Sequence, residues 1–384
     1  MIDEALFSDA ERSRYHRQVI MADFGPQAQE KLKRSRVLVV GAGGLGSPVL
    51  LYLAAAGVGH LGIIDCDAVD ESNLHRQVLF GVDTVGKDKV AAARERLRLL
   101  NPFVEITTYP VQLTSQNALE LIRSYDVVAD GTDNFPTRYL VNDACVLLDK
   151  PNVYASIYQF EGQVAVFNWV DAQGVRGPNY RDLYPHPPEP GAVANCAEAG
   201  VLGVLPGIVG SMQALEVIKV ITGIGEPLSG KLCAFDALSF ELRTFRVTKN
   251  PANPLTGDSP TLTTLIDYEQ FCGVEAIETA VKEVEPTEFL TWQEQGDVQV
   301  IDVREPDEYE IVHLDSELLP LATLADQVDK IARDKRVVVL CKTGRRSSRA
   351  IRLLEKQFGY TNLYNLKGGI LNYIAQLGLE LPVY

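Results

Sequence analysis

The chain has 384 residues, more than one hydrophobic core usually supports, so we expect two domains. Its formal net charge of −15 disfavours partners that need a basic surface, so we expect no binding to nucleic acid or to an anionic membrane. No apolar run reaches the roughly 18 residues of a membrane-spanning helix, and the first residues lack the order of a signal peptide. We therefore expect a cytoplasmic protein. Because the cytoplasm is reducing, we interpret the six scattered cysteines one by one and not as a disulfide framework.

A helical pattern covers residues 8–33, and Arg14 and Arg17 lie three apart on one face of it. The pattern alone favours a solvated helix. The next segment, 37–40, is a short apolar, β-branched run that predicts a buried parallel strand.

A glycine-rich loop follows this strand. Gly41, Gly43 and Gly46 match the G-x-G-x-x-G template, with Gly44 between them, and a helix is expected over 47–56. Such a loop lets backbone N–H groups approach anionic oxygens, and the helix N-terminus favours negative charge. Asp65 closes the next apolar run, where a carboxylate can accept from a ribose hydroxyl. The pattern predicts a site for the adenosine half of a nucleotide, and NAD, FAD and ATP remain open.

The charged residues downstream favour ATP. Arg76 lies in a polar loop, Lys89 lies where a helix opens, and Asp133 follows a strand at 127–130. Because open α/β sheets bind ligands at the carboxyl ends of their strands, these side chains should share one crevice with Asp65. The diphosphate of NAD needs fewer cations, whereas ATP with magnesium needs cations for three phosphates and a carboxylate for the metal.

A long irregular segment, 171–200, is rich in proline and predicts a functional loop. Cys196 lies at its end, directly before a glycine-punctuated apolar helix whose N-terminus would favour a thiolate. The alternative is that Cys196 is simply a small buried hydrophobe.

The second domain is predicted from a change in composition. We assign 1–250 to the first domain, the Pro/Asn/Gly-containing segment 251–282 to a linker, and 283–384 to a smaller α/β domain. In this domain a buried strand ends at Cys341, which is followed by a loop of Lys342, Thr343, Gly344, Arg345 and Arg346, with a helix expected from about Ser347. Backbone N–H groups, a helix N-terminus and cations would favour a thiolate or a persulfide anion. A Cys-x5-Arg phosphatase loop is excluded because the sixth residue after Cys341 is Ser347.

These motifs together resemble two known families. RYHRQ, GAGGLG, DCDAVDESNLHRQ, GKDK, DGTDN and CAEAGVLGVLPG are similar to the ubiquitin-activating-enzyme-like adenylyltransferases of the MoeB/ThiF/HesA family, and CKTGRRS resembles a rhodanese loop. The whole resembles the fused molybdopterin-synthase sulfurylase type. The resemblance implies a Rossmann-like adenylation domain with a mixed, mainly parallel sheet, joined to a smaller α/β rhodanese domain.

The resemblance also implies roles for single residues. Asp65 would hold the ribose, Asp133 the magnesium ion, and Arg17 would enter the neighbouring subunit's site in a homodimer. Cys196 would take part in thiol chemistry on the carrier, and Cys341 would carry a persulfide. The groups facing the phosphates would be the loop from Gly41 to Gly46, Asn73, Arg76 and Lys89.

The implied activity is ATP-dependent adenylation of the C-terminal glycine of a ubiquitin-like sulfur carrier ending in Gly-Gly, followed by sulfur transfer from the rhodanese persulfide to give a thiocarboxylate. A cysteine desulfurase or thiosulfate would be the sulfur donor. The pathways that remain open are molybdopterin (molybdenum-cofactor), thiamine and cysteine biosynthesis, tRNA thiolation and secondary metabolism. The alternatives are a carrier thioester on Cys196 used for conjugation to proteins, an NAD-dependent oxidoreductase, and a rhodanese unit that serves only for docking.

One departure from the resemblance concerns a structural zinc. Relatives usually have two C-x-x-C pairs, and the matching positions here are Asn179, Asp182, Asn253 and Thr256. Zinc prefers thiolate and imidazole, and neutral Asn and Thr side chains are poor ligands. We therefore predict no structural zinc.

Overall fold

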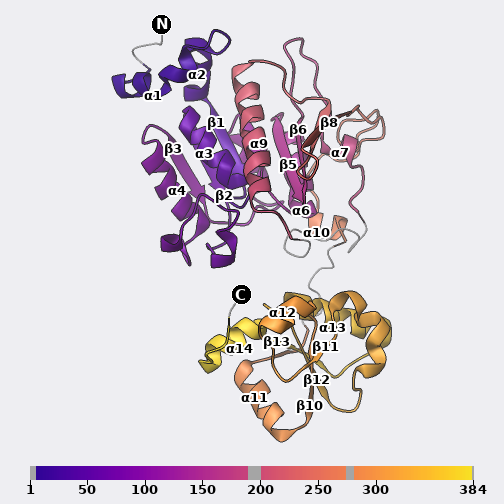
Figure 1. Ribbon diagram of the computed structural model, residues 1–384. Helices are drawn as coiled ribbons and strands as arrows, with labels where there is room; N and C mark the ends of the chain where they lie inside the picture. Colours follow the sequence, from indigo (N-terminus) through magenta and orange to yellow (C-terminus); the bar gives the residue numbers. More distant parts are fainter. Residues whose placement is uncertain (1–5, 189–199, 274–280, 383–384) are drawn as a thin grey trace. The chain divides into compact units, whose positions relative to one another are not determined.

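The computed structural model describes residues 6–188, 200–273 and 281–382, which belong to two compact units, Met1–Ala276 and Ile277–Tyr384. Each unit has its own sheet and its own hydrophobic cores (Figure 1).

The described elements of the first unit are α1 (Asp9–Val19), α2 (Gly25–Arg34), β1 (Arg36–Val40), α3 (Gly46–Ala56), β2 (His60–Ile64), η1 (Glu71–Asn73), η2 (Val82–Thr84), α4 (Lys89–Leu100), β3 (Glu105–Tyr109), α5 (Ala118–Arg123), β4 (Val127–Asp130), α6 (Phe135–Leu147), β5 (Asn152–Tyr158), β6 (Glu161–Phe167), α7 (Tyr180–Leu183), α9 (Val204–Thr222), β7 (Lys231–Asp236), β8 (Glu241–Arg246) and α10 (Tyr268–Phe271).

The larger sheet has the strand order β3-β2-β1-β4-β5-β6-β7-β8. The first five strands in this order are parallel, and β6, β7 and β8 continue the sheet antiparallel. The chain order reverses beside β1, so the loops after β1, β2 and β4 lie at the edge where open α/β sheets bind ligands. The prediction of a mixed, mainly parallel sheet is confirmed.

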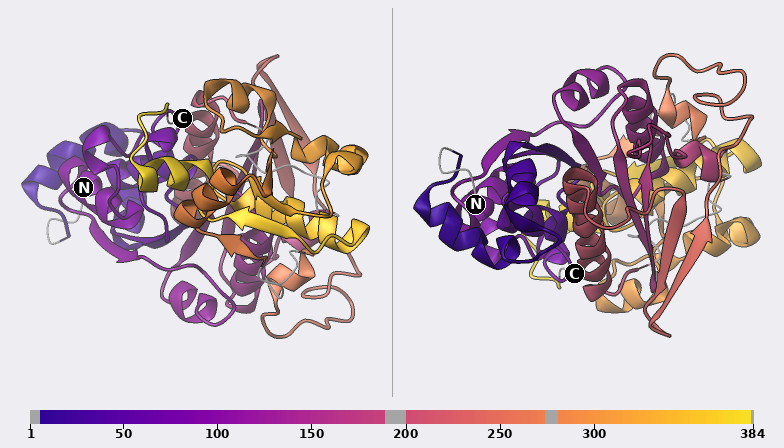
Figure 2. Two further views of the ribbon diagram at one scale, coloured as in Figure 1. Left: turned by 90° about the horizontal axis from the view of Figure 1, so that it is seen from below. Right: turned by 90° about the horizontal axis from the view of Figure 1, so that it is seen from above.

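Side-chain alternation along β1 separates two helical layers. Val37 and Val39 pack with residues of α2, α3, α4 and α9, whereas Leu38 and Val40 pack with residues of α5, α6 and α10. Because successive side chains of a strand point to opposite faces, the two groups of helices cover opposite faces of the sheet. Figure 2 gives two further views of these layers.

The helix α9 differs from the sequence prediction. It is long and apolar enough, by length and composition alone, to cross a membrane, although we expected no such segment. It packs against α2, α3 and the strands β4, β5 and β6, which is the position of a core helix. Glu216 and Lys219 form an ion pair of 2.6 Å along it.

The segment after β8 packs on the first unit as far as Gly273. Tyr268 and Cys272 are buried in the core beside α6, and Tyr268 donates to Asp143 Oδ2 at 2.8 Å. Arg181 and Asp143 form a fully buried ion pair of 2.7 Å, which ties α7 to α6. The contacts of the segment 251–273 therefore belong to the first unit, whereas the sequence interpretation assigned it to a linker.

The second unit contains β9 (Glu283–Val284), α11 (Pro286–Gln295), β10 (Val298–Asp302), α12 (Pro306–Ile311), β11 (Glu317–Leu318), η3 (Leu321–Lys330), β12 (Arg336–Leu340), α13 (Arg345–Phe358), β13 (Leu363–Leu366) and α14 (Gly369–Leu377). Its sheet, β11-β10-β12-β13-β9, is parallel throughout. Residues of α13 and η3 pack on one face, and residues of α11 and α14 pack on the other. Cys341 directly follows the central strand, β12.

Candidate active sites

The glycine loop after β1 can be built only from glycines at its two ends. Gly41 has a φ of +91°, and a Cβ on Gly46 would lie 1.9 Å from the carbonyl oxygen of Gly41. The loop therefore turns sharply and brings the backbone to the start of α3, as an anion-binding loop requires.

Asp65, at the end of β2, is fixed beside this loop. Its Oδ2 accepts from the backbone N–H of Ala42 at 2.8 Å, and its Oδ1 accepts from that of Asp67 at 2.9 Å. Burial raises the pKa of Asp65, against the opposing effects of Lys89 and the two backbone donors. Because each carboxylate oxygen has a further lone pair, Asp65 can still accept from the hydroxyls of a ribose.

Two carboxylates follow β4, and the structure distinguishes them. Asp130 is 1% exposed, and its Oδ1 accepts from Thr132 N at 3.0 Å and Thr132 Oγ1 at 2.6 Å. Burial raises the pKa of Asp130. Asp133 is exposed, directly before Asn134, which caps α6. Of the two carboxylates, Asp133 is therefore the one accessible from solvent.

The loop that contains Asn73 and Arg76 lies against the glycine loop. A Cβ on Gly44 would be 3.8 Å from Arg76 Cγ, and a Cβ on Gly43 would be 3.8 Å from Gln77 Nε2. Arg76 itself donates to the carbonyl oxygen of Ser72 at 3.1 Å. Two of the groups predicted to face the phosphates, the glycine loop and Arg76, therefore lie side by side.

The other residues predicted for this site are Lys89, Arg17 and Cys196. Lys89 is buried and forms an ion pair of 2.8 Å with Asp67. Arg17 is exposed on α1. Cys196 lies outside the described residues.

The loop after β12 holds Cys341 as a buried thiol. Cys341 is 1% exposed, and its Sγ is 3.2 Å from the backbone nitrogen of Gly344 and 3.3 Å from Ser347 Oγ. Gly344 has a φ of +89°, and α13 begins at Arg345, two residues earlier than predicted. The predicted helix N-terminus and backbone donor are therefore beside the sulfur.

The charges of this loop are partly neutralised. Arg346 forms two hydrogen bonds with the carboxylate of Glu308, of 2.5 and 2.6 Å. Glu308 lies on α12, which is held by the fully buried ion pair of Arg304 and Asp302. Lys342 is half-buried, whereas Thr343 and Arg345 are exposed.

Sequence reasoning missed three residues of this site: Glu308, Ser347 as a partner of the thiol, and Asn365, which accepts from Ser347. Only the position of Ser347 on the first turn of the helix after Cys341 was a usable signal, because Glu308 and Asn365 come from distant segments.

The four residues at the zinc positions are joined by hydrogen bonds. Asn253 Nδ2 donates to Asp182 Oδ1 at 2.7 Å and to Asn179 Oδ1 at 3.2 Å, and Asn179 Nδ2 donates to Thr256 Oγ1 at 2.9 Å. The backbone N–H groups of Asn179 and Asn250 donate to the two oxygens of Asp182. Oxygens that already accept from N–H groups are poorly suited to a metal ion, so this donor set does not fit zinc.

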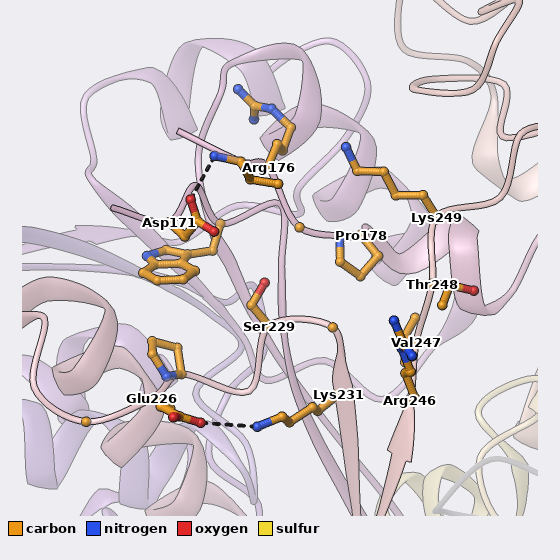
Figure 3. Close-up of a pocket in the computed structure, with 16 residues that line it drawn as sticks. Asp171, Arg176, Pro178, Glu226, Ser229, Lys231, Arg246, Val247, Thr248 and Lys249 are labelled. Carbon is orange, nitrogen blue, oxygen red and sulfur yellow. Dashed lines mark hydrogen bonds and ion pairs between the residues drawn. The ribbon is translucent and has the colours of Figure 1, made fainter. Parts of the chain in front are cut away.

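A cavity of about 660 Å³ lies in the first unit (Figure 3). It is bordered by residues that follow β6, lie at the start of β7 and lie at or after the end of β8, including Arg176, Lys231 and Lys249. Because β6 runs antiparallel to β5, the end of β6 lies at the edge opposite to the glycine loop. Glu226 pairs with Lys231 at 3.4 Å across its rim.

The chain thus combines an α/β unit that carries a glycine loop with a second unit that places a buried cysteine between a strand and a helix. The chain belongs to the ThiF family, whose model matches residues 15–255, and a model of the rhodanese-like domain matches residues 285–376. The chain is accordingly an adenylyltransferase and a sulfurtransferase.

Individual relatives agree with this assignment. The chain is 47% identical over 385 residues to the probable adenylyltransferase/sulfurtransferase MoeZ of Mycobacterium tuberculosis, covering 98% of this chain and 96% of that protein. It is 58% identical over 264 residues to the sulfur carrier protein adenylyltransferase of Thermus thermophilus, covering 69% of this chain and 97% of that protein. Among solved structures, Escherichia coli MccB with MccA-N7isoASN has a TM-score of 0.57 at 23% identity, over 66% of this chain and 76% of that chain, and shares the fold. The two sequence relatives and the two family models favour adenylation with sulfur transfer over conjugation and over hydride transfer.

Proposed function

We propose that the chain uses ATP and magnesium to adenylate the C-terminal glycine of a ubiquitin-like sulfur carrier ending in Gly-Gly, and then transfers sulfur from a persulfide on Cys341 to that glycine. The observation that carries the proposal is that one chain holds both a glycine loop beside a fixed Asp65 and a buried Cys341 that accepts a backbone hydrogen bond. The similarity to a sulfur carrier protein adenylyltransferase supports the choice of substrate.

In the first step a carboxylate oxygen of the carrier attacks the α-phosphorus of ATP. An acyl–O–P bond forms, the bond between the α- and β-phosphates breaks, and pyrophosphate leaves. Positioning and charge neutralisation carry such a step. Magnesium, bound to Asp133, would neutralise phosphate charge. The protein groups proposed to face the phosphates are the loop from Gly41 to Gly46, Asn73, Arg76, Lys89 and Arg17 of a homodimer partner.

Lys89 would reach a phosphate by exchanging its ion pair with Asp67 for the ligand. Because Asp67 is exposed, water can solvate its carboxylate once Lys89 has left. Arg76 would leave the carbonyl oxygen of Ser72 in the same way.

In the second step the terminal sulfur of the Cys341 persulfide attacks the activated carbonyl carbon, and AMP leaves, which gives an acyl disulfide. The thiolate of Cys196 then attacks the sulfur of Cys341. The S–S bond breaks, the thiocarboxylate leaves with the electron pair, and a disulfide between the two cysteines remains. A cellular dithiol, in the cytoplasm, reduces this disulfide with two electrons and two protons. A cysteine desulfurase or thiosulfate then reloads Cys341.

The experiment uses the Cys341→Ala variant with ATP, a sulfur donor and a carrier. We expect normal carrier-dependent ATP–pyrophosphate exchange but no thiocarboxylate, as detected by mass spectrometry of the carrier. Cys233→Ala, which changes a half-buried cysteine of the first unit, is the matched control and should retain both. Thiocarboxylate formation by Cys341→Ala at the wild-type rate would overturn the proposal.

A further inference from the structure

The hydroxyl of Ser347 lies between two groups that compete for its single proton. Ser347 Oγ is 3.3 Å from Cys341 Sγ and 2.6 Å from Asn365 Oδ1. All three residues are at most 2% exposed, so bulk water does not replace either partner. A hydroxyl has one proton to donate, and it can donate to only one of the two at a time.

Asn365 is held in the orientation that accepts this proton. Its Nδ2 donates to Glu283 Oε1 at 3.3 Å, and a carboxylate can only accept, so Oδ1 must face Ser347. Strand pairing sets this arrangement, because Asn365 of β13 lies opposite Glu283 of β9. The sheet register thus places an acceptor behind the Ser347 hydroxyl.

The two states of Cys341 make different demands on Ser347. With a neutral thiol, the hydroxyl donates to Asn365 and the S–H group can donate to Ser347 Oγ. With a thiolate, the hydroxyl must turn to donate to the sulfur, and Asn365 Oδ1 then loses its buried donor. A hydrogen bond to an anionic sulfur is stronger than one to a neutral acceptor, but an unsatisfied buried oxygen opposes the change. Gly344 N–H lies 3.2 Å from the sulfur and can donate to a thiolate without such a competitor.

We propose that Asn365 is a positioning residue that acts through Ser347: by competing for the hydroxyl proton, it restrains ionisation of Cys341 and so limits the rate at which the thiol takes up sulfur. This inference rests on the proposed function of Cys341 as the persulfide carrier. It assigns to Ser347 the role of the switchable donor and to Asn365 the role of its resting acceptor.

The test measures the alkylation rate of Cys341 by iodoacetamide at neutral pH in the full-length chain, by mass spectrometry of the peptide that contains Cys341. Ser347→Ala removes the switchable donor and should slow alkylation about tenfold. Asn365→Leu removes the competitor and should accelerate alkylation about threefold to tenfold. The ultraviolet absorbance of the thiolate should change in the same directions.

The double variant Ser347→Ala/Asn365→Leu separates this role from a structural one. Because Asn365 acts through Ser347, the double variant should react at the rate of Ser347→Ala alone. Slower alkylation of Asn365→Leu, or an equal effect of Asn365→Leu with and without Ser347, would overturn the proposal. Asn362→Leu is the matched control, since Asn362 bonds to the carbonyl oxygens of Ala332 and Lys335, and it should leave the rate unchanged.

The two proposals fail separately. If Cys341→Ala still produces thiocarboxylate, the proposed function fails whatever the alkylation rates show. If Cys341 is required but the rates of the Asn365 and Ser347 variants do not follow the predicted order, only the positioning role fails. Folding of each variant is checked by the fluorescence of Trp292, which lies in the second unit.

Discussion

Asn253 Nδ2 donates to Asp182 Oδ1 at 2.7 Å across a sequence separation of 71 residues, and this bond fastens the turn after β8 to the start of α7. Asn179 and Asn253 are each 1% exposed. The polar side chains therefore connect the two segments that a zinc ion would join in a protein with two C-x-x-C pairs.

The first prediction concerns this hydrogen-bonded cluster. The purified chain should contain no stoichiometric zinc, and EDTA should leave its unfolding unchanged, because hydrogen bonds replace the metal. Asn253→Ala should lower the unfolding free energy of the first unit by about 2 kcal/mol, since it leaves the half-buried carboxylate of Asp182 and the buried side-chain oxygen of Asn179 without this donor. Metal analysis and urea unfolding, followed by Trp169 fluorescence in a Trp292→Phe background, check both points.

The control is Thr263→Ala, an exposed position in the same segment, which should unfold like the parent. One tightly held zinc per chain would contradict the prediction.

The second prediction concerns the buried pair of Arg181 and Asp143. Asp143→Leu should destabilise the first unit by about 3–5 kcal/mol, because it leaves the guanidinium of Arg181 buried without its counter-charge. The double variant Asp143→Leu/Arg181→Met should be less destabilised than Asp143→Leu alone, as measured by the same urea assay. Equal stability of Asp143→Leu and the parent would show that the pair does not hold α7 and α6 together.

The third prediction concerns Asp65. Asp65→Asn should raise the KM for ATP about tenfold or more in ATP–pyrophosphate exchange, because it removes a charged acceptor for the ribose hydroxyls. Persulfide loading of Cys341 should be unaffected, since Cys341 belongs to the other unit. Asp83→Asn, at an exposed aspartate of η2, is the control. An unchanged KM would remove Asp65 from the nucleotide site.

The fourth prediction concerns the contribution of His60 to the pH dependence of the first unit's stability. Burial, and then Arg36, lowers the pKa of His60 in the folded state. The unfolded chain therefore binds a proton at a pH where the folded chain does not, and the stability of the first unit should fall as pH decreases through the ordinary histidine range. His60→Gln should lose less unfolding free energy than the parent between pH 7 and pH 5, in urea titrations at both values. An identical loss in both proteins would refute it.

Local patterns predicted the elements that carry the proposed nucleotide site. The apolar run at 37–40 and the glycine template fix β1 and the start of α3, because both depend on neighbouring residues. The apolar run before Cys341 likewise predicts β12. In these cases the residues that determine the element are neighbours in the sequence, so the sequence alone predicts it.

The remaining features depend on contacts between distant segments. The packing of 251–273 is set by Tyr268, whose partner Asp143 lies 125 residues earlier, while its Pro and Asn residues are typical of a linker. Arg346 was expected to face the sulfur, but its pairing with Glu308 depends on where α12 lies. Lys89 was similarly expected to face a phosphate, but it pairs with Asp67. The isolated β-bridge between Ala68 and Asp88 brings these two segments together.

The most direct test of the central claim is ATP–pyrophosphate exchange by the purified full-length chain, with and without each ubiquitin-like protein ending in Gly-Gly from the source cell. We predict exchange that requires one such carrier, is lost in Asp133→Ala, and is retained in Cys341→Ala. Absence of exchange with every carrier would contradict adenylation by this chain.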